Sequence, residues 1–300
     1  MELKTFEGMW GEKNAAGEEI WFSPLNKKLL AGNASARRKY SLSPLHYWAI
    51  RDMGAFLEKH KSQPSPRIID FGCGTGSETI HLASCIGHPI KGYDIFPTQL
   101  AIADAFEKDA KTGCSFGMLN DGKIPEADAS IDVIYSSHVL GHVPDVKVML
   151  KDWARVLKPG GQVALYTESN FSPVDTSMAA DIYRKFNVSQ LRDLEHHISL
   201  YPREELEPMF AEAGFTFHRR VAYNAWKPVF DPSALKLLLS KSPASYRPVA
   251  RFFLNLWSRV RKVVPFYPLS VDYAYMLMGK SRGTDAYSDC YYYLLEKKPS

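Results

Sequence analysis

The sequence lacks several features that mark other classes of protein. No apolar run in its 300 residues is long enough to span a bilayer. Its four cysteines form no CxxC pair and no disulfide framework, so we expect a reducing, cytoplasmic compartment. Its nine histidines do not fall into the HExxH pattern of a zinc helix, so we expect no metal. The first residues, Glu2-Leu3-Lys4-Thr5, are charged and polar, and we expect no signal peptide.

Negative charge is missing from one long stretch of the chain. Between Pro232 and Val271 there is no Asp or Glu, although the net charge of the whole chain is only +4. The basic character of the protein is therefore local. The same stretch carries seven positive side chains, namely Lys236, Lys241, Arg247, Arg251, Arg259, Arg261 and Lys262.

The chain is organised around a strand, a glycine-rich turn and a helix. Ile68 and Ile69 begin a short apolar run that predicts a buried strand. Glu78 then lies in the first turn of a predicted helix, where the helix dipole favours an acid. In an open parallel sheet, ligands bind beside such turns, and glycine lets a ligand approach without a Cβ in the way. The turn itself reads Asp70-Phe71-Gly72-Cys73-Gly74-Thr75-Gly76.

The glycine spacing indicates which ligand the turn serves. A dinucleotide fingerprint would place its third glycine where Ser77 stands, and a phosphate loop would end in Gly-Lys-Ser/Thr, which is absent. The pattern Asp-x-Gly-x-Gly-x-Gly instead resembles motif I of the class I S-adenosylmethionine (SAM) dependent methyltransferases. A glycine turn that binds no ligand is the alternative.

A second acid lies at the distance expected for a nucleoside ligand. Asp94 ends a predicted strand and lies 18 residues beyond Gly76. An acid about 20 residues past the glycines accepts hydrogen bonds from ribose hydroxyls. Ile95 follows, where an apolar side chain can press on an adenine face. The alternative is a solvated acid in a turn.

Three further segments resemble the same family in its own order. Asn120 to Pro125 is similar to the family stretch that meets adenine, and Ile131 to Val143 resembles motif IV. In motif IV, Ile131 replaces a phenylalanine, and Gly141 replaces the first histidine of a pair. Leu157-Lys158-Pro159-Gly160-Gly161 matches a family turn, and we expect a helix to end there at Lys158. The resemblance covers residues 66–166 and is strongest to the ubiquinone-type and small-metabolite methyltransferases.

The resemblance implies an α/β fold, a Rossmann-like seven-stranded sheet in the order 3-2-1-4-5-7-6 with helices on both faces. Residues 215–223 and 290–295 supply the last two strands. We expect an N-terminal lid or tail at 1–42, a SAM-binding core at 43–223, a basic helical insertion between strands 6 and 7 at 224–283, and the final strand within 284–300. The cofactor-binding residues implied are Asp70, Gly72, Cys73, Gly74, Gly76, Asp94, Ile95, Asn120, Asp121 and Ser137.

Methyl transfer from SAM is an in-line displacement, so the enzyme must align the acceptor and remove a proton. Histidine is the natural base near neutral pH. His142 and His138 follow the fourth strand, and Glu168 follows the fifth, which makes them the candidate catalytic residues. Both histidines could instead satisfy backbone groups of the loop. The segment that covers the substrate pocket in the family suggests His197 and Tyr201, and Tyr273 is a further candidate.

The acceptor is expected to be a small molecule, methylated at O, N, S or C. Nucleic acid is disfavoured, because the chain lacks the Asn/Asp-Pro-Pro-Tyr motif and any recognisable RNA-binding module. The insertion predicts an amphipathic helix, and three roles stay open for it: packing on the core or on a second copy in a homodimer, handling an anionic substrate, or lying on a membrane through residues 247–264. A lipid acceptor and a non-catalytic SAM-binding scaffold are the alternative functions.

Overall fold

The computed structural model describes residues 11–13, 19–21, 28–29, 31–41, 44–61, 65–170, 181, 197–223, 235–236, 239–240, 243–263 and 290–299. Tyr273, the third predicted pocket residue, and most of the 224–283 insertion lie outside these ranges.

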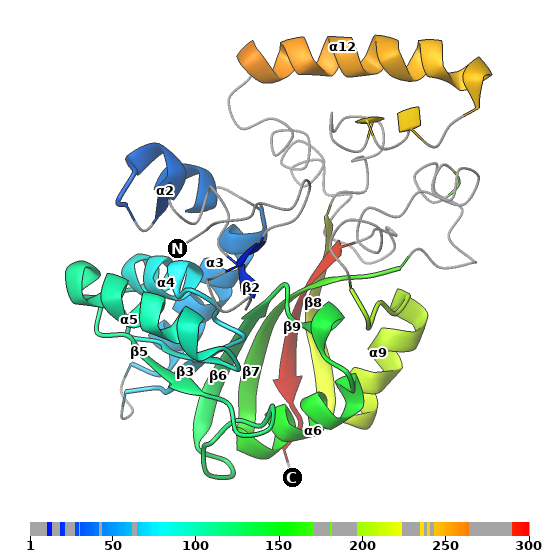
Figure 1. Ribbon diagram of the computed structural model, residues 1–300. Coiled ribbons are helices and arrows are strands. Elements are labelled where there is room, and N and C mark those ends of the chain that lie inside the picture. The colour runs from blue at the N-terminus through cyan, green and yellow to red at the C-terminus, as the bar shows by residue number, and fades with distance from the viewer. Residues whose placement is uncertain are drawn as a thin grey trace.

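A seven-stranded sheet forms the centre of the molecule (Figure 1). Its strand order is β5-β4-β3-β6-β7-β9-β8, which is the predicted 3-2-1-4-5-7-6. The first five strands are parallel, and β9 runs antiparallel to both of its neighbours. The strands are β3 (Ile68–Phe71), β4 (Lys91–Asp94), β5 (Ser115–Met118), β6 (Ile131–Ser137), β7 (Leu157–Glu168), β8 (Phe215–Tyr223) and β9 (Cys290–Lys297).

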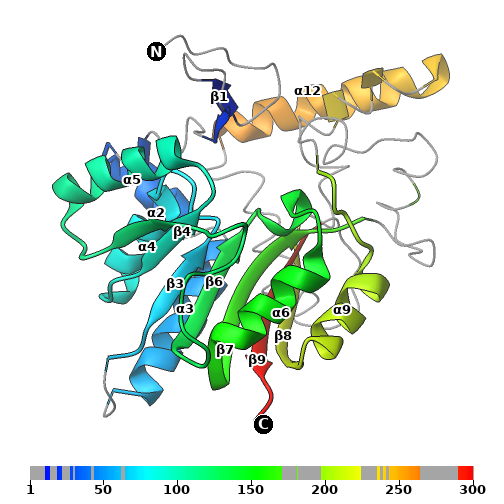
Figure 2. The same ribbon diagram turned by 60° about the horizontal axis from the view of Figure 1, so that its bottom comes forward.

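Helices cover both faces of the sheet, as predicted (Figure 2). One face packs against α3 (Pro44–Lys59), α4 (Ser77–Ile86) and α5 (Pro97–Ala110), and the other against α6 (Val146–Val156) and α9 (Arg203–Glu212). Successive strand residues point to opposite faces, so both sides of each central strand are apolar. In β9, for example, Tyr292 joins the core under α3 while Tyr291 and Tyr293 join the core under α6 and α9.

One predicted helix boundary was wrong by two residues. The helix α6 ends at Val156 rather than at Lys158, and Leu157 is already extended. The reason is local, because the residue before a proline is driven out of the helical region, and Lys158 precedes Pro159. Gly160 then takes a φ of +75°, and the pairing of β6 with β7 shifts register at this point.

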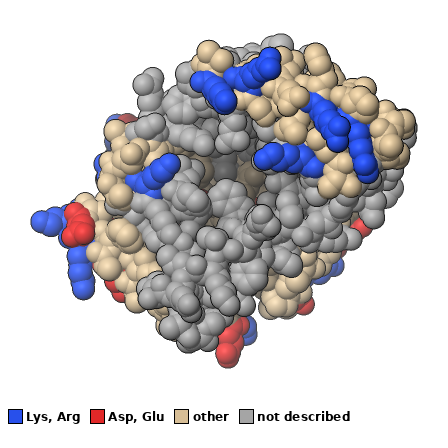
Figure 3. Space-filling view, turned by 45° about the horizontal axis from the view of Figure 1, so that its top comes forward, with Lys and Arg blue, Asp and Glu red and all other residues tan. Residues whose placement is uncertain are grey.

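The N-terminal segment and the insertion add elements outside the sheet. β1 (Gly11–Lys13) and β2 (Glu19–Trp21) form an antiparallel pair, and α2 (Ala34–Ser41) packs on α3. The helix α12 (Arg247–Val263) follows the short 3-10 helix η2 (Ala244–Tyr246). It crosses above the carboxyl ends of the parallel strands (Figure 1), and Lys and Arg side chains gather over it (Figure 3). Within the described ranges, no helix is long and apolar enough to cross a membrane.

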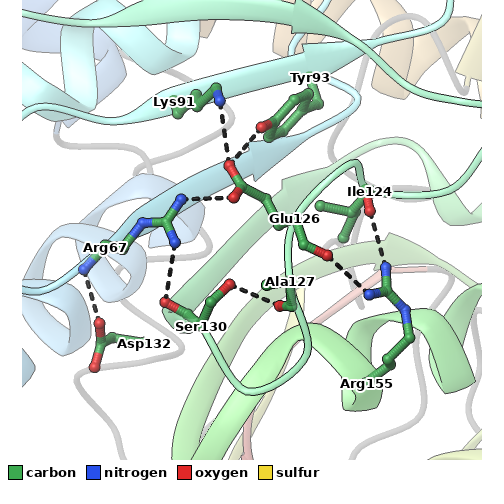
Figure 4. Close-up of polar contacts among 9 residues, drawn as sticks. All are labelled: Arg67, Lys91, Tyr93, Ile124, Glu126, Ala127, Ser130, Asp132 and Arg155. Carbon is green, nitrogen blue, oxygen red and sulfur yellow. Dashed lines mark hydrogen bonds and ion pairs between the residues drawn. The ribbon is translucent and has the colours of Figure 1, made fainter.

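Near the amino ends of β3 and β4, the Glu126 carboxylate contacts three side chains (Figure 4). Arg67 Nη2 lies 2.6 Å from one carboxylate oxygen, and Lys91 Nζ and Tyr93 OH lie 3.2 Å and 2.6 Å from the other. Arg155 donates to the Glu126 carbonyl at 2.8 Å. These contacts join the start of β3, β4 and α6 through side chains, and we assign them a structural role.

Candidate active site

The glycine turn after β3 has the backbone that glycine alone adopts easily. Gly72 and Gly76 have φ angles of +78° and +71°. A Cβ on Gly72 would lie 2.3 Å from Cγ2 of Val139, and one on Gly76 would lie 2.7 Å from Cβ of Ala103. The amide of Gly72 donates to the Tyr93 carbonyl at 2.7 Å, which ties the turn to β4. The turn is therefore fixed in place and closed to larger residues.

Asp94 presents a carboxylate next to this turn. Its Oδ2 accepts the Gly74 amide at 2.8 Å, and its Oδ1 accepts the Phe96 amide at 3.0 Å. Burial raises the pKa of Asp94, and the amides of Gly74 and Phe96 act in the opposite direction. Each oxygen keeps a second lone pair, so the carboxylate can also accept two hydroxyl groups. Ile95 beside it is 52% exposed, an apolar surface next to a polar acceptor.

Asp70 ties the strand to the helix beneath the turn. Thr79 Oγ1 of α4 donates to Asp70 Oδ2 at 2.6 Å, and the Asp70 side chain is buried. Burial raises the pKa of Asp70 to about 8, and the negative charges of Glu78 and Asp94 add to this, while the Thr79 hydrogen bond lowers it. Asp70 therefore links the end of β3 to the first turn of α4, on either side of the glycine turn.

The other predicted cofactor residues lie along the same edge. Asn120 and Asp121 are exposed in the turn after β5, where Asp121 has a φ of +48°. The amide of Leu119 donates to the Asp94 carbonyl at 2.9 Å, which joins this turn to β4. Ser137 ends β6, and its Oγ is buried. The structure thus brings all ten predicted residues to the carboxyl ends of four adjacent strands, β3 to β6.

The predicted catalytic residues gather around Glu168 at the end of β7. Glu168 is 1% exposed. Its Oε1 is hydrogen-bonded to Nδ1 of His138, and its Oε2 lies 3.6 Å from Nε2 of His197. Burial alone would raise the pKa of Glu168, but His138 and His197 lower it well below its usual range. An ionised carboxylate therefore lies between two histidines.

Glu168 fixes the orientation and the tautomer of His138. An ionised carboxylate only accepts hydrogen bonds, so Nδ1 of His138 carries the proton and the neutral ring has its lone pair on Nε2. The His138 ring packs on Tyr166, with ring centroids 4.4 Å apart, and its side chain is 50% exposed. His138 also has a φ of +57°, which is uncommon for a residue with a side chain. The half-exposed imidazole of His138 is therefore held by the buried carboxylate of Glu168.

His142 belongs to the same cluster but differs from His138 in basicity. It ends the 3-10 helix η1 (Leu140–His142), and its ring stacks on His197 with centroids 4.3 Å apart. Burial and the neighbouring His197 lower the pKa of His142 to about 4, although Glu168 acts against this. His142 is therefore neutral near pH 7 and a weaker proton acceptor than an ordinary histidine.

The structure explains why Gly141 replaces the first histidine of the family pair. A Cβ on Gly141 would lie 2.0 Å from Cδ2 of His197. The carbonyl of Gly141 also accepts the amides of Ile198 and Ser199 at 2.8 Å and 2.9 Å. His197 thus occupies the space that a side chain at position 141 would need. One signal for this contact was present in the sequence, the glycine at position 141 in place of a histidine. That signal did not indicate that His197 fills the space.

Tyr201 lies next to the cluster through its backbone. Its carbonyl accepts Ser169 Oγ at 2.8 Å and the Asn170 amide at 3.2 Å. The segment from His197 to Tyr201 is therefore fastened to the end of β7 beside Glu168. The prediction that this segment lines a substrate pocket is consistent with that position and stays a prediction.

A second polar cluster beside the glycine turn was missed from the sequence. The Glu78 carboxylate accepts the Tyr135 hydroxyl at 2.7 Å and lies 3.5 Å from Nε2 of His46. Burial would raise the pKa of Glu78, but His46, His138 and Tyr40 lower it to about 2. The sequence indicated only that Glu78 is an acid in a first helical turn. Among the described residues, no group of three or more His, Cys, Asp or Glu is placed to hold a metal ion.

Comparison with known proteins matches residues 45–219 to a family described as a methyltransferase domain. The O-methyltransferase resE of Aspergillus sclerotiorum is 29% identical over 167 residues, which span 55% of this chain and 59% of that protein. A ubiquinone biosynthesis O-methyltransferase of Rhizobium etli is 24% identical over 256 residues, 81% of this chain and 95% of that protein.

A solved structure from Galdieria sulphuraria, described as a candidate sarcosine dimethylglycine methyltransferase, has the same fold. Its TM-score is 0.53 at 18% identity, and the match covers 97% of this chain and 94% of that one. The family match spans more than half of the chain and coincides with the glycine turn, Asp94 and the Glu168 cluster. The protein therefore belongs to the methyltransferase domain family, within the class I SAM-dependent methyltransferases.

Proposed function

We propose that this protein transfers a methyl group from SAM to a small-molecule hydroxyl or amine, with His138 as the base that takes the acceptor's proton. The observation that carries the proposal is the pair formed by His138 and the buried Glu168 carboxylate, at the same sheet edge as the glycine turn. The two relatives from Aspergillus sclerotiorum and Rhizobium etli are O-methyltransferases, which supports a hydroxyl acceptor.

The residues along the edge fit SAM. The Asp94 carboxylate keeps the acceptor capacity that two ribose hydroxyls need, and exposed Ile95 offers an apolar surface for adenine. Gly72 and Gly76 keep side chains out of the turn. When bound, SAM would supply an electrophilic methyl group, with its S–CH3 bond breaking and S-adenosylhomocysteine as the leaving group. No metal is invoked in the proposed reaction.

The chain's own residues would handle the proton. Glu168 holds Nδ1 of His138, so Nε2 is the atom that accepts the proton from the acceptor's O–H or N–H as the new bond to carbon forms. The resulting imidazolium is stabilised by the Glu168 carboxylate beside it. Glu168 is therefore a positioning residue, and His142, with its low pKa, is the weaker candidate base.

The test uses purified protein, methyl-labelled SAM and a cell extract partitioned between water and organic solvent. We expect label in the aqueous small-molecule fraction. His138→Gln should lower the rate by about 10²-fold or more with SAM affinity unchanged, since general-base catalysis contributes about 10² to 10⁴. Glu168→Gln should lower the rate and alter the pH profile. The matched control is His218→Gln, because His218 pairs with Glu296, which lies in β9 at the opposite end from Cys290, the partner of Glu168 in the sheet. A normal rate in His138→Gln would refute its role as base.

The same experiment separates the alternative functions. Label in the organic fraction would favour a lipid or isoprenoid acceptor. SAM binding without label in either fraction would favour a non-catalytic scaffold. We propose the cytoplasm as the compartment. This proposal is supported by the four cysteines, which all lie within the described residues and are all free thiols.

A further inference from the structure

The helix α12 exposes apolar side chains that a helix packed on a protein core would bury. Val249, Phe252 and Val263 are 58%, 64% and 79% exposed, and Leu256 is 38% exposed. Their spacing of three, four and seven residues places all four on one face of the helix. Of the roles left open for this helix, packing on the core does not account for this exposed stripe.

A different stripe of α12 is less exposed. Ala250 is buried, and Leu254, Trp257 and Val260 are partly buried. Each α-helical residue turns about 100° from the last, so Ala250, Leu254 and Trp257 lie on the side away from Phe252, and Val260 lies between the two stripes. The helix therefore has one apolar stripe that is at least partly buried and a second one that is exposed.

Basic side chains border the outward stripe. Arg251, Arg259 and Lys262 are all exposed, and helical geometry places them next to the face of Phe252. Figure 3 shows Lys and Arg gathered over this helix with no Asp or Glu among them. The outer surface of α12 thus combines exposed apolar groups with positive charge, the pattern of helices that lie in a membrane interface.

We infer that α12 docks the protein on an anionic lipid surface, with Val249, Phe252, Leu256 and Val263 entering the interface and the basic side chains on the headgroups. Charge decides between lipid and a second copy of the chain, because two copies of α12 would bring like charges together with no acid in the stretch to offset them. A nucleic acid would complement the positive charge, but its phosphate backbone would not bury the exposed Val and Leu side chains.

The position of α12 determines which side of the protein would face the lipid. The helix crosses above the carboxyl ends of the parallel strands, the same edge that carries the glycine turn and Glu168 (Figure 1). Docking would therefore turn the candidate active site towards the lipid. The docking itself does not depend on methyl transfer, so it can be tested without SAM or an acceptor.

The test is co-flotation of the full chain with vesicles of phosphatidylcholine alone or with about a third phosphatidylserine. We expect binding to the anionic vesicles only, weakening as salt is raised. The triple variant Arg251→Gln/Arg259→Gln/Lys262→Gln should bind about a hundred-fold more weakly, since each basic residue near an anionic surface contributes about five-fold. Phe252→Ser should weaken binding by about ten-fold.

The matched control is Lys59→Gln/Lys108→Gln/Lys151→Gln, which removes the same charge from exposed positions on the body. It should bind like the wild type, because it leaves α12 unchanged. Equal loss in both triple variants would overturn the inference, since it would show a response to net charge alone. No binding to anionic vesicles would also overturn it, as would a dimer in sedimentation that Phe252→Ser dissociates, or RNA binding as tight as vesicle binding.

Discussion

Substituting Gly141 tests whether His197 really fills the place of the family's missing histidine. In Gly141→Ala the new Cβ would start 2.0 Å from His197 Cδ2 and 3.0 Å from its Nε2, whereas ordinary contacts begin near 3.4 Å. The His197 ring would have to move by more than an ångström. It has little room, because it is 8% exposed, stacks on His142 and lies 3.6 Å from Glu168.

The expected cost follows from this overlap. Gly141 does not have a positive φ, so alanine is permitted by the backbone and the loss comes from crowding alone. Overpacking a filled site costs about 1–3 kcal/mol. At about 2 kcal/mol the midpoint of thermal unfolding should fall by roughly 4–8 °C, since about 2–4 °C is lost per kcal/mol in chains of this size. Circular dichroism during heating would measure it.

A double-variant cycle identifies the cause. Removing the ring in His197→Ala should make the further change Gly141→Ala nearly neutral, so the two effects should be non-additive by more than about 1 kcal/mol. Gly54→Ala is the matched control, because its Cβ would meet nothing within 4 Å and it lies in the helix α3, where alanine is favoured. Additivity within about 0.5 kcal/mol would refute the contact between position 141 and His197.

Two further substitutions test the ion-pair network and the cofactor site. Burial would raise the pKa of Glu126, but hydrogen bonds from Tyr93, Arg67 and Lys91 lower it from 4.5 to about 2, so its stabilisation is complete above pH 4.5 and is lost as pH falls towards 2. Glu126→Gln should therefore cost about 1–2 kcal/mol at pH 7, a value reduced because Arg67 and Lys91 are half exposed, and the gap should narrow in urea unfolding as the pH is lowered towards 2. Asp94→Asn should weaken SAM binding about 10–100-fold in titration calorimetry, since hydrogen bonds to a charged group contribute about 1.5–3 kcal/mol, while Asp104→Asn on the exposed side of α5 should not.

The sheet could be predicted because its signals are local. The strand at Ile68, the glycines after it and the acid at Asp94 lie within 27 residues of one another, and each sets its own backbone conformation. The strand order came from the family resemblance, since nothing in the residues themselves says that β9 inserts between β7 and β8.

The contacts that define the site could not be predicted in the same way. His197 reaches Glu168 across 29 residues of chain, and Glu78 reaches His46 from a different helix. Such contacts depend on how helices and loops pack, which hydrophobic periodicity does not specify. For α12, periodicity identified an amphipathic helix, but only packing decided which apolar side chains stay exposed.

The acids along the carboxyl edge show why residue type alone could not assign their roles. Asp70 and Glu168 are equally buried, and burial pushes the pKa of each upwards. For Asp70, burial and two neighbouring acids outweigh the opposing hydrogen bond from Thr79, so its pKa rises to about 8. Glu168 has two histidines, so its pKa falls well below the usual range. Near pH 7 Glu168 is therefore ionised beside the residue proposed to receive a proton, whereas the Asp70 carboxyl is largely protonated.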